Sequence, residues 1–290
     1  MHWHLLALAV ACIWGSTFVA SKVLLMAGLT PAEIMCMRFV LAWMLMLPFC
    51  HKQLKTNLRD ELLMMTLGLS GGSLYFLAEN TALQLTSATS TVALLVSTTP
   101  IVTALMNRCM HRGEHLSGRF LSGSMVALVG VALVVFNGVF ILDDNPWAML
   151  LALGASFTWG IYSLVIRHVE KRYSSAVITR KVFFWGVITM LPICLMEDND
   201  FGPGLFSPTV IGTLLFLGLV ASLGCFLLWN IVLRRIGIIA AGNYLYFNPV
   251  TSLIVAYIVL NEHITGLAIL GCLLTIVGVY LCNRKKKDKK

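Results

Sequence analysis

The stretch Glu114-His115-Leu116-Ser117-Gly118 occurs a second time, with two conservative changes, as Glu262-His263-Ile264-Thr265-Gly266. Further upstream, Trp14-Gly15 in the first half of the chain matches Trp159-Gly160 in the second half. Glycines also follow the two copies at the same intervals, Gly123, Gly130, Gly271 and Gly278, and we expect them to mark close contacts between helices. The chain is therefore one unit written twice, and any predicted fold has to account for this repetition.

The composition predicts a membrane protein. Hydrophobic residues make up 58% of the 290 residues and charged residues only 12%, whereas about a quarter of a soluble domain is charged. Mean hydropathy is +0.86, and apolar stretches of about 20 residues, long enough to cross the hydrocarbon core, fill nearly the whole chain. We predict an all-α polytopic membrane protein with ten transmembrane helices, at 5–26, 32–49, 62–83, 87–110, 116–136, 146–168, 175–196, 209–233, 238–260 and 264–282.

The number of spans in each copy determines how the copies are oriented. Five spans fall in each half, and an odd number places the second copy upside down in the membrane. Inverted repeats of this kind recur in secondary transporters. We expect a first five-helix repeat over 1–137, a second, inverted one over 146–283, and a basic tail over 284–290.

Positive charge alternates between the joints that connect the spans. Odd-numbered joints carry no Lys or Arg, and their charged residues are all acidic, whereas every even-numbered joint and the tail carry Lys or Arg. By the positive-inside rule, both termini lie in the cytoplasm. The net charge of +8 then reflects orientation and attraction to anionic lipid, so the lipid bilayer of the cell membrane is an expected partner and nucleic acid is not.

A proline lies near the centre of the fourth span of each copy, Pro100 and Pro249. Each removes a helical hydrogen bond, and such interruptions persist in a membrane where neighbours or a cavity satisfy the freed carbonyl. Thr98 lies beside the first proline, and Tyr246 and Asn248 beside the second. Matching interrupted helices indicate a transporter's substrate site; the alternative is a packing kink.

Two tryptophans fall near the middle of the membrane, although this residue prefers the interfaces. Trp14 is accompanied by Ser16, and Trp159 by Tyr162. We interpret them as an aromatic wall for a partly apolar substrate, with structural packing as the alternative.

Ionisable residues inside spans are costly and mark candidate sites. Arg38 and Glu79 lie roughly 7–10 Å inside the outer ends of their spans, at 1.5 Å per residue. We expect both to face the cavity, where Arg38 holds a carboxylate and Glu79 an amine or a coupling proton; the alternative is an ion pair that only locks two helices. Lys181, at similar depth from the cytoplasmic side, and Tyr75 complete the predicted lining.

The cysteines and histidines indicate no metal site and no cofactor. The eight cysteines occur singly, without a CxxC pair, and the seven histidines all lie at span ends or in joints.

The pattern resembles the EamA type of the drug/metabolite transporter superfamily over essentially the whole chain. The residues that carry the resemblance are Trp14-Gly15 with Ser16, Arg38, the segment from Tyr75-Phe76 to Ala82-Leu83, Pro100, Glu114, Gly123 and Gly130, then Trp159-Gly160, Asn230, Pro249, Glu262, Gly271 and Gly278. The resemblance implies alternating access around a central cavity and substrates such as amino acids, their derivatives or other small metabolites, often exported. Glu79 departs from the family pattern, which is aromatic or small there.

We therefore expect a secondary transporter for a small-molecule substrate, with protons as a candidate coupling ion. A substrate-selective channel or facilitator is the main alternative. A membrane-embedded enzyme is less favoured, because no HExxH motif and no nucleophile–base pairing is present. The repeated Glu-His motif is interpreted as a gate or helix-entry element at each mouth, with the substrate site between the copies.

Overall fold

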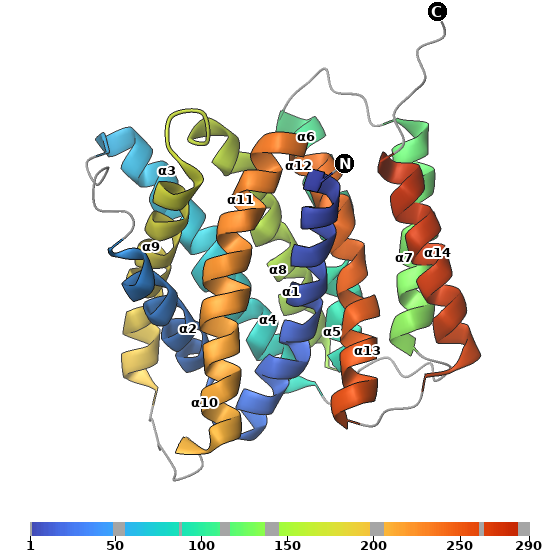
Figure 1. The fold of residues 1–290 in the computed structure, drawn as a ribbon, viewed down its shortest axis with the longest axis horizontal. Helices are drawn as coiled ribbons and strands as arrows, with labels where there is room; N and C mark the ends of the chain where they lie inside the picture. Colours follow the sequence, from blue (N-terminus) through green and yellow to red (C-terminus); the bar gives the residue numbers. More distant parts are fainter. Residues whose placement is uncertain are drawn as a thin grey trace, which may run out of the picture.

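The computed structural model describes residues 2–48, 56–86, 89–110, 117–136, 145–197, 206–260 and 264–283. Within these residues all regular structure is helical, and ten helical spans form one bundle (Figure 1). Nine of them are long and apolar enough to cross a membrane; the remaining one, α2, has 16 residues. The predicted helical membrane fold is confirmed. Glu114, His115, Glu262, His263 and the tail 284–290 lie outside the described residues.

The helices of the first half are α1 (His2–Met26), α2 (Pro31–Met46), α3 (Leu58–Gly68), η1 (Leu69–Ser73), α4 (Leu74–Leu85), α5 (Thr89–Val96), α6 (Thr99–Met110) and α7 (Gly118–Phe136). Those of the second half are α8 (Pro146–Val165), η2 (Ile166–His168), α9 (Ser175–Met196), α10 (Pro208–Leu215), η4 (Phe216–Gly224), α11 (Cys225–Ile236), α12 (Ile238–Gly242), η5 (Asn243–Phe247), α13 (Asn248–Leu260) and α14 (Gly266–Asn283). The segments η1 and η4 are π-helical, and η2 and η5 are 3₁₀-helical.

The packing repeats between the halves. Helix α1 of the first half packs against α11 and α13 of the second half. In the same way, α8 of the second half packs against α4 and α6 of the first half. α2 pairs with α9, and α7 with α14, which stand together at one edge of the bundle (Figure 1). The third span of each half contains a π-helical segment, η1 or η4. Each contact thus has a counterpart, as expected for two related repeats.

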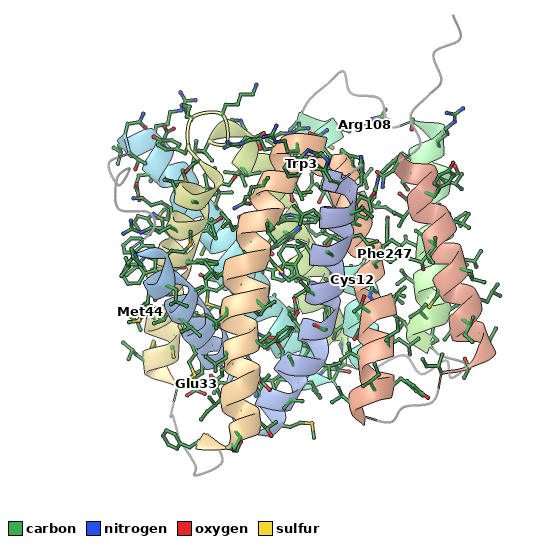
Figure 2. The ribbon with its side chains drawn as sticks, viewed as in Figure 1. Trp3, Cys12, Glu33, Met44, Arg108 and Phe247 are labelled. Atoms are coloured by element: carbon green, nitrogen blue, oxygen red, sulfur yellow. The ribbon has the colours of Figure 1, made fainter. Side chains whose placement is uncertain are left out.

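Helix α1 begins and helix α14 ends on the same side of the bundle (Figure 1). We call this the terminal side and the other the opposite side. Arg108 lies at the terminal side and Glu33 toward the opposite side (Figure 2). Large apolar side chains such as Met44, which is 56% exposed, cover the outer surface (Figure 2), as expected where helices face lipid.

The glycines that follow the repeated motif bring α7 and α14 into contact. A Cβ added to Gly130 would lie 2.5 Å from the Thr275 nitrogen, and one added to Gly271 would lie 2.5 Å from the Gly130 carbonyl oxygen. Only residues without side chains allow backbones to approach so closely. The prediction that these glycines mark close helix contacts is confirmed.

The hydroxyl residue of each motif copy begins a helix. Ser117 Oγ accepts a hydrogen bond from the Phe120 N–H at 3.1 Å, and Thr265 Oγ1 accepts one from the Ala268 N–H at 3.3 Å. A side-chain oxygen in this position satisfies an otherwise unpaired N–H of the first turn. This part of the motif is therefore a helix-entry element in both copies.

Candidate functional site

A cavity lies between the two halves of the bundle. Helices α1, α4, α5 and α6 contribute from the first half, and α8, η5 and α13 from the second. Its lining residues are Trp14, Thr17, Phe18, Tyr75, Phe76, Glu79, Val96, Thr99, Trp159, Leu245 and Asn248. The cavity holds about 30 Å³, room for roughly one or two water molecules, so in this conformation it is nearly closed.

Aromatic rings form one wall of the cavity. The rings of Trp14 and Trp159 meet edge to face, with centroids 5.2 Å apart, and Tyr75 lies 5.1 Å from Trp159. The Trp14 indole donates a hydrogen bond to the Ala221 carbonyl at 2.9 Å, which fixes the ring between the repeats. The predicted tryptophan pair is therefore brought together at the cavity, although its two members lie 145 positions apart in the sequence.

The first interrupted helix supplies hydroxyl groups beside the cavity. α5 ends at Val96 and α6 begins at Thr99, just before Pro100. The Val96 carbonyl, which loses its helical partner to the proline, accepts hydrogen bonds from Thr99 at 2.6 Å and from Ser156 of α8 at 3.2 Å. Thr99 lines the cavity, whereas Thr98 does not and instead bonds the Leu95 carbonyl at 2.6 Å.

The second interruption precedes Pro249, where the chain forms the 3₁₀ segment η5 before α13. Asn248 lines the cavity, and within the described residues its Oδ1 is buried without a hydrogen-bond partner. Tyr246, also predicted to bind substrate, points elsewhere. It is fully buried in an apolar cluster with Ala127 and Val131 of α7.

Glu79 supplies the carboxylate of the cavity. It is 2% exposed, lines the cavity, and interacts with Tyr75, one turn earlier on α4. It is the sole acidic residue among the described lining residues, and a carboxylate can accept hydrogen bonds from a cationic or protonated group.

Arg38 lies next to the cavity rather than in its lining. Its Nε donates to the Ser222 hydroxyl at 2.8 Å, and its guanidinium lies over the Phe76 ring, 4.2 Å from the centroid. In the described part of the chain, neither terminal nitrogen has a hydrogen-bond partner, and Glu79 is close enough for an electrostatic interaction but forms no ion pair within 4.0 Å. Arg38 and Glu79, which were predicted to pair, thus lie near each other but do not form a direct ion pair.

Ser16 and Tyr162 are turned away from the cavity. Ser16 Oγ donates back to the Ile13 carbonyl at 2.6 Å. The Tyr162 hydroxyl donates to Asn230 Oδ1 at 2.6 Å, and the Asn230 amide donates to Thr179 at 2.8 Å. This chain ties α8, α11 and α9 together, so Tyr162 is placed where it holds helices rather than where it lines the cavity.

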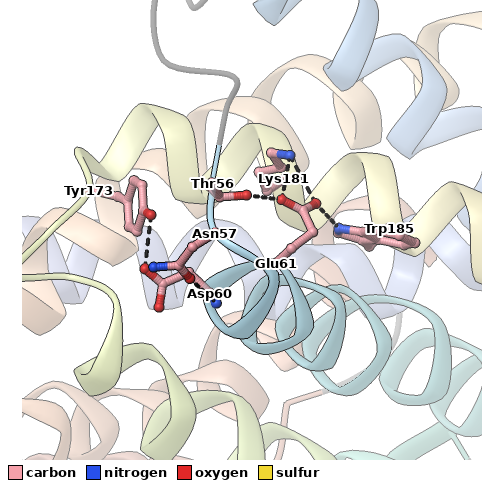
Figure 3. A network of polar contacts seen from close by, with 7 residues as sticks. All are labelled: Thr56, Asn57, Asp60, Glu61, Tyr173, Lys181 and Trp185. Carbon is pink, nitrogen blue, oxygen red and sulfur yellow. Dashed lines mark hydrogen bonds and ion pairs between the residues drawn. The ribbon is translucent and has the colours of Figure 1, made fainter.

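Lys181 lies in a separate polar network near the terminal side (Figure 3). Its ammonium contacts both Glu61 oxygens, at 2.8 and 2.9 Å, and the Trp185 indole donates to the same carboxylate at 2.7 Å. Thr56 also donates to Glu61. This network joins α3 to α9, and the prediction that Lys181 lines the cavity does not match its placement.

A second part of the same network lies at the start of α3. The Asp60 carboxylate accepts a hydrogen bond from the Tyr173 hydroxyl at 2.9 Å (Figure 3). It also pairs with Arg172 at 2.6 Å. Burial and the neighbouring Asp60 charge raise the pKa of Tyr173, because both disfavour a phenolate. Together the two contacts lock α3 of the first repeat to the segment before α9 of the second.

Several lining residues were not predicted from the sequence. Thr17 and Phe18 lie three and four positions after Trp14, hence on the same helix face, and this spacing was available as a signal. Phe76, Val96 and Leu245 are apolar residues in apolar helices and carry no comparable signal. Among the described residues, no group of three potential metal ligands occurs.

Ten helical spans in two inverted repeats, with a partly polar cavity between them, are the architecture of a secondary membrane transporter. Comparison with known proteins gives the family. The model of the EamA-like transporter family matches residues 1–136 and again residues 146–284, and the chain belongs to this family.

Individual relatives agree with this assignment. A protein of Archaeoglobus fulgidus described as an uncharacterized transporter is 28% identical over 98% of both chains. An Escherichia coli protein described as a probable amino-acid metabolite efflux pump is 25% identical over 95% of this chain and 93% of its own. A probable terminal-alkyne amino-acid exporter of Streptantibioticus cattleyicolor is 26% identical over 69% of this chain and 66% of its own. A solved crystal structure with 16% identity superposes with a TM-score of 0.78 over 97% of this chain and 98% of its own, so the fold is shared.

Proposed function

We propose that this protein exports small amino-acid-like metabolites by alternating access, with the terminal side facing the cytoplasm. The observation that carries the proposal is the cavity between the repeats, which both halves line and which lies at the two interrupted helices. Positive charges on the terminal side support the orientation. The printed descriptions of two relatives, an efflux pump and an exporter, support the direction.

The chemistry of the cavity supports a substrate with an ammonium group and an apolar part. Glu79 offers a carboxylate, and the rings of Trp14, Tyr75 and Trp159 offer aromatic faces to a cation or an apolar chain. Arg38, with two unpartnered nitrogens beside the cavity, is positioned to attract a carboxylate once the cavity widens. An amino acid carries all three features.

The small volume supports a cycle in which the cavity opens to one side at a time. At about 30 Å³ the cavity has no room for an amino acid, so the helices around it must separate before substrate enters. The interruptions before Pro100 and Pro249 provide positions where a helix can bend without breaking further hydrogen bonds.

The test is flux into liposomes that contain the purified protein, with a panel of amino acids, peptides and cationic drugs. Saturable flux of at least one amino acid supports the proposal. Conductance that rises linearly with concentration would instead indicate a channel, and turnover without translocation would indicate an enzyme.

Proton coupling through Glu79 is tested in the same liposomes. Glu79→Gln keeps the shape of the side chain but cannot release a proton, so flux should lose its pH dependence while the protein still folds. Glu170→Gln is the matched control, because burial raises the pKa of Glu170 outside the spans and makes it a rival source of pH dependence. Unchanged pH dependence in Glu79→Gln, or its loss in Glu170→Gln alone, would refute coupling through Glu79.

A further inference from the structure

A second and larger cavity opens at the terminal side of the bundle. It holds about 480 Å³, within the range of sites that bind small organic molecules. Five polar residues line it, one each from α1, η2, α11, η5 and α14: His4, Arg167, Arg235, Asn243 and Asn283. The joint between α11 and α12 also contributes to the lining. No acidic residue is among the described residues that line it. We call it the vestibule.

Each arginine of the vestibule has an uncharged group as its direct contact among the described residues. Arg167 donates to the amide oxygen of Asn107 at 2.9 Å, and the Arg235 guanidinium lies over the Trp3 ring, 5.1 Å from its centroid. Glu170 lies within electrostatic range of Arg167 from the following joint, but it does not line the vestibule. Among the described residues, no ion pair involves Arg235, so its positive charge is available to a ligand.

The vestibule also contains an incomplete amide pair. Asn243, which is 1% exposed, donates to Asn283 Oδ1 at 3.1 Å. In the described residues this leaves Asn283 Nδ2 and Asn243 Oδ1 buried without partners. Buried polar groups are normally satisfied, and an unpartnered N–H donor beside arginines is the arrangement that an oxyanion completes.

The vestibule and the central cavity are joined by one short segment. Asn243 opens η5 at the vestibule, and Asn248, which follows η5, lines the central cavity. At about 2 Å per residue in a 3₁₀-helix, the two residues are separated by about 10 Å. Trp14, which lines the central cavity, packs against Trp229 with ring centroids 5.1 Å apart.

We propose that the vestibule binds the oxyanion group, carboxylate or phosphate, of a small soluble metabolite. Arg235 is the main charge, Arg167 the second, and the Asn283 amide the hydrogen-bond donor. Passage of the bound molecule to the central cavity rests on the proposed function, whereas binding itself does not.

The experiment measures anion binding to the full chain in nanodiscs of phosphatidylcholine. Inorganic phosphate and N-acetylglycine are titrated at constant ionic strength, and dissociation constants are taken from the shift in thermal midpoint. Arg235→Gln should weaken binding about tenfold, the effect of losing one charge-assisted hydrogen bond, and Arg235→Lys should recover part of the loss. Arg119→Gln is the control, because it removes an exposed arginine at the terminal-side end of α7 and should bind like the parent.

Three outcomes would overturn the proposal. If Arg235→Gln binds both anions as tightly as the parent protein, Arg235 is not the charge that holds the anion. Equal weakening in Arg119→Gln indicates only general attraction to a basic surface. Loss of phosphate binding when phosphatidylglycerol is added to the nanodiscs identifies a lipid headgroup as the occupant. If anions bind as expected but the protein gives no flux in liposomes, the proposed transport function is refuted, whereas the proposed anion site is supported.

Discussion

Gly15 and Gly160, which follow the paired tryptophans, are equivalent in the two repeats but have different neighbours. Substitution by alanine is therefore predicted to have unequal effects at the two positions. A Cβ added to Gly15 would lie 2.4 Å from the backbone oxygen of Asn248. A Cβ added to Gly160 would lie 2.7 Å from the sulfur of Met106. A backbone carbonyl in a packed helix cannot turn aside, whereas a methionine side chain has three rotatable bonds with which to move.

The magnitudes follow from these distances. Ordinary contact begins near 3.4 Å, so Gly15→Ala requires α1 and the start of α13 to separate by about 1 Å. Overpacking of this kind costs about 1–3 kcal/mol, while alanine gains up to about 1 kcal/mol over glycine in a helix. We expect Gly15→Ala to lower the free energy of unfolding by about 1–2 kcal/mol and Gly160→Ala to change it by less than about 0.5 kcal/mol.

The assay is denaturant-induced unfolding of the purified variants in mixed micelles, followed by liposome flux. Gly154→Ala is the control, because nothing lies within 4 Å of its added Cβ and it reports the helix gain alone. Gly15→Ala should also reduce flux, since Asn248 lines the cavity. The reasoning is refuted if Gly160→Ala is as destabilised as Gly15→Ala, or if Gly15→Ala is as stable as Gly154→Ala.

Two further substitutions separate structural from substrate-binding roles. Lys181→Gln should lower the free energy of unfolding by about 1 kcal/mol, because it removes a partly exposed ion pair with Glu61. It should leave the KM of transport unchanged. A large rise in KM would show instead that Lys181 contributes to substrate binding. Arg38→Lys keeps the charge but loses the planar stacking and the Nε bond to Ser222; if Arg38 holds a substrate carboxylate, KM should rise about tenfold. Ser222→Ala removes only that bond and should change KM less than twofold, and equal effects of the two variants in liposome flux would argue for a purely structural arginine.

Much of the architecture could be predicted from the sequence because the repeat, the span lengths and the joints are properties of the chain itself. The glycines after the repeated motif were expected to pack, and they do so across α7 and α14. The prolines were expected to coincide with interruptions near the substrate site, and the cavity lies beside both. Proline and glycine carry this information because their backbone effects do not depend on distant neighbours.

The direction in which a side chain points was harder to predict. The depth of a residue in the membrane follows from its position in the span, at 1.5 Å per residue. The rotation of a helix about its axis can be predicted only where one face is apolar and the other polar. These helices are apolar on nearly every face, so the sequence does not indicate which face points inward. Lys181 was expected to line the cavity, but its ammonium contacts Glu61; Tyr246 was expected to bind substrate, but it lies in an apolar cluster with residues of α7. Distant polar partners such as Glu61 decide these orientations, and no local pattern reveals them.

The position of the cavity depends on where the repeats differ. Asn80 of α4 matches Asn230 of α11, so the counterpart of Glu79 is Trp229. Glu79 faces the cavity, whereas Trp229 is 1% exposed and packs against Trp14. The two equivalent positions therefore differ in role: one contributes a carboxylate to the cavity lining, and the other contributes an indole that packs against Trp14. The repeat therefore supplies two equivalent positions, and the difference between Glu79 and Trp229 makes only the first of them part of the cavity lining.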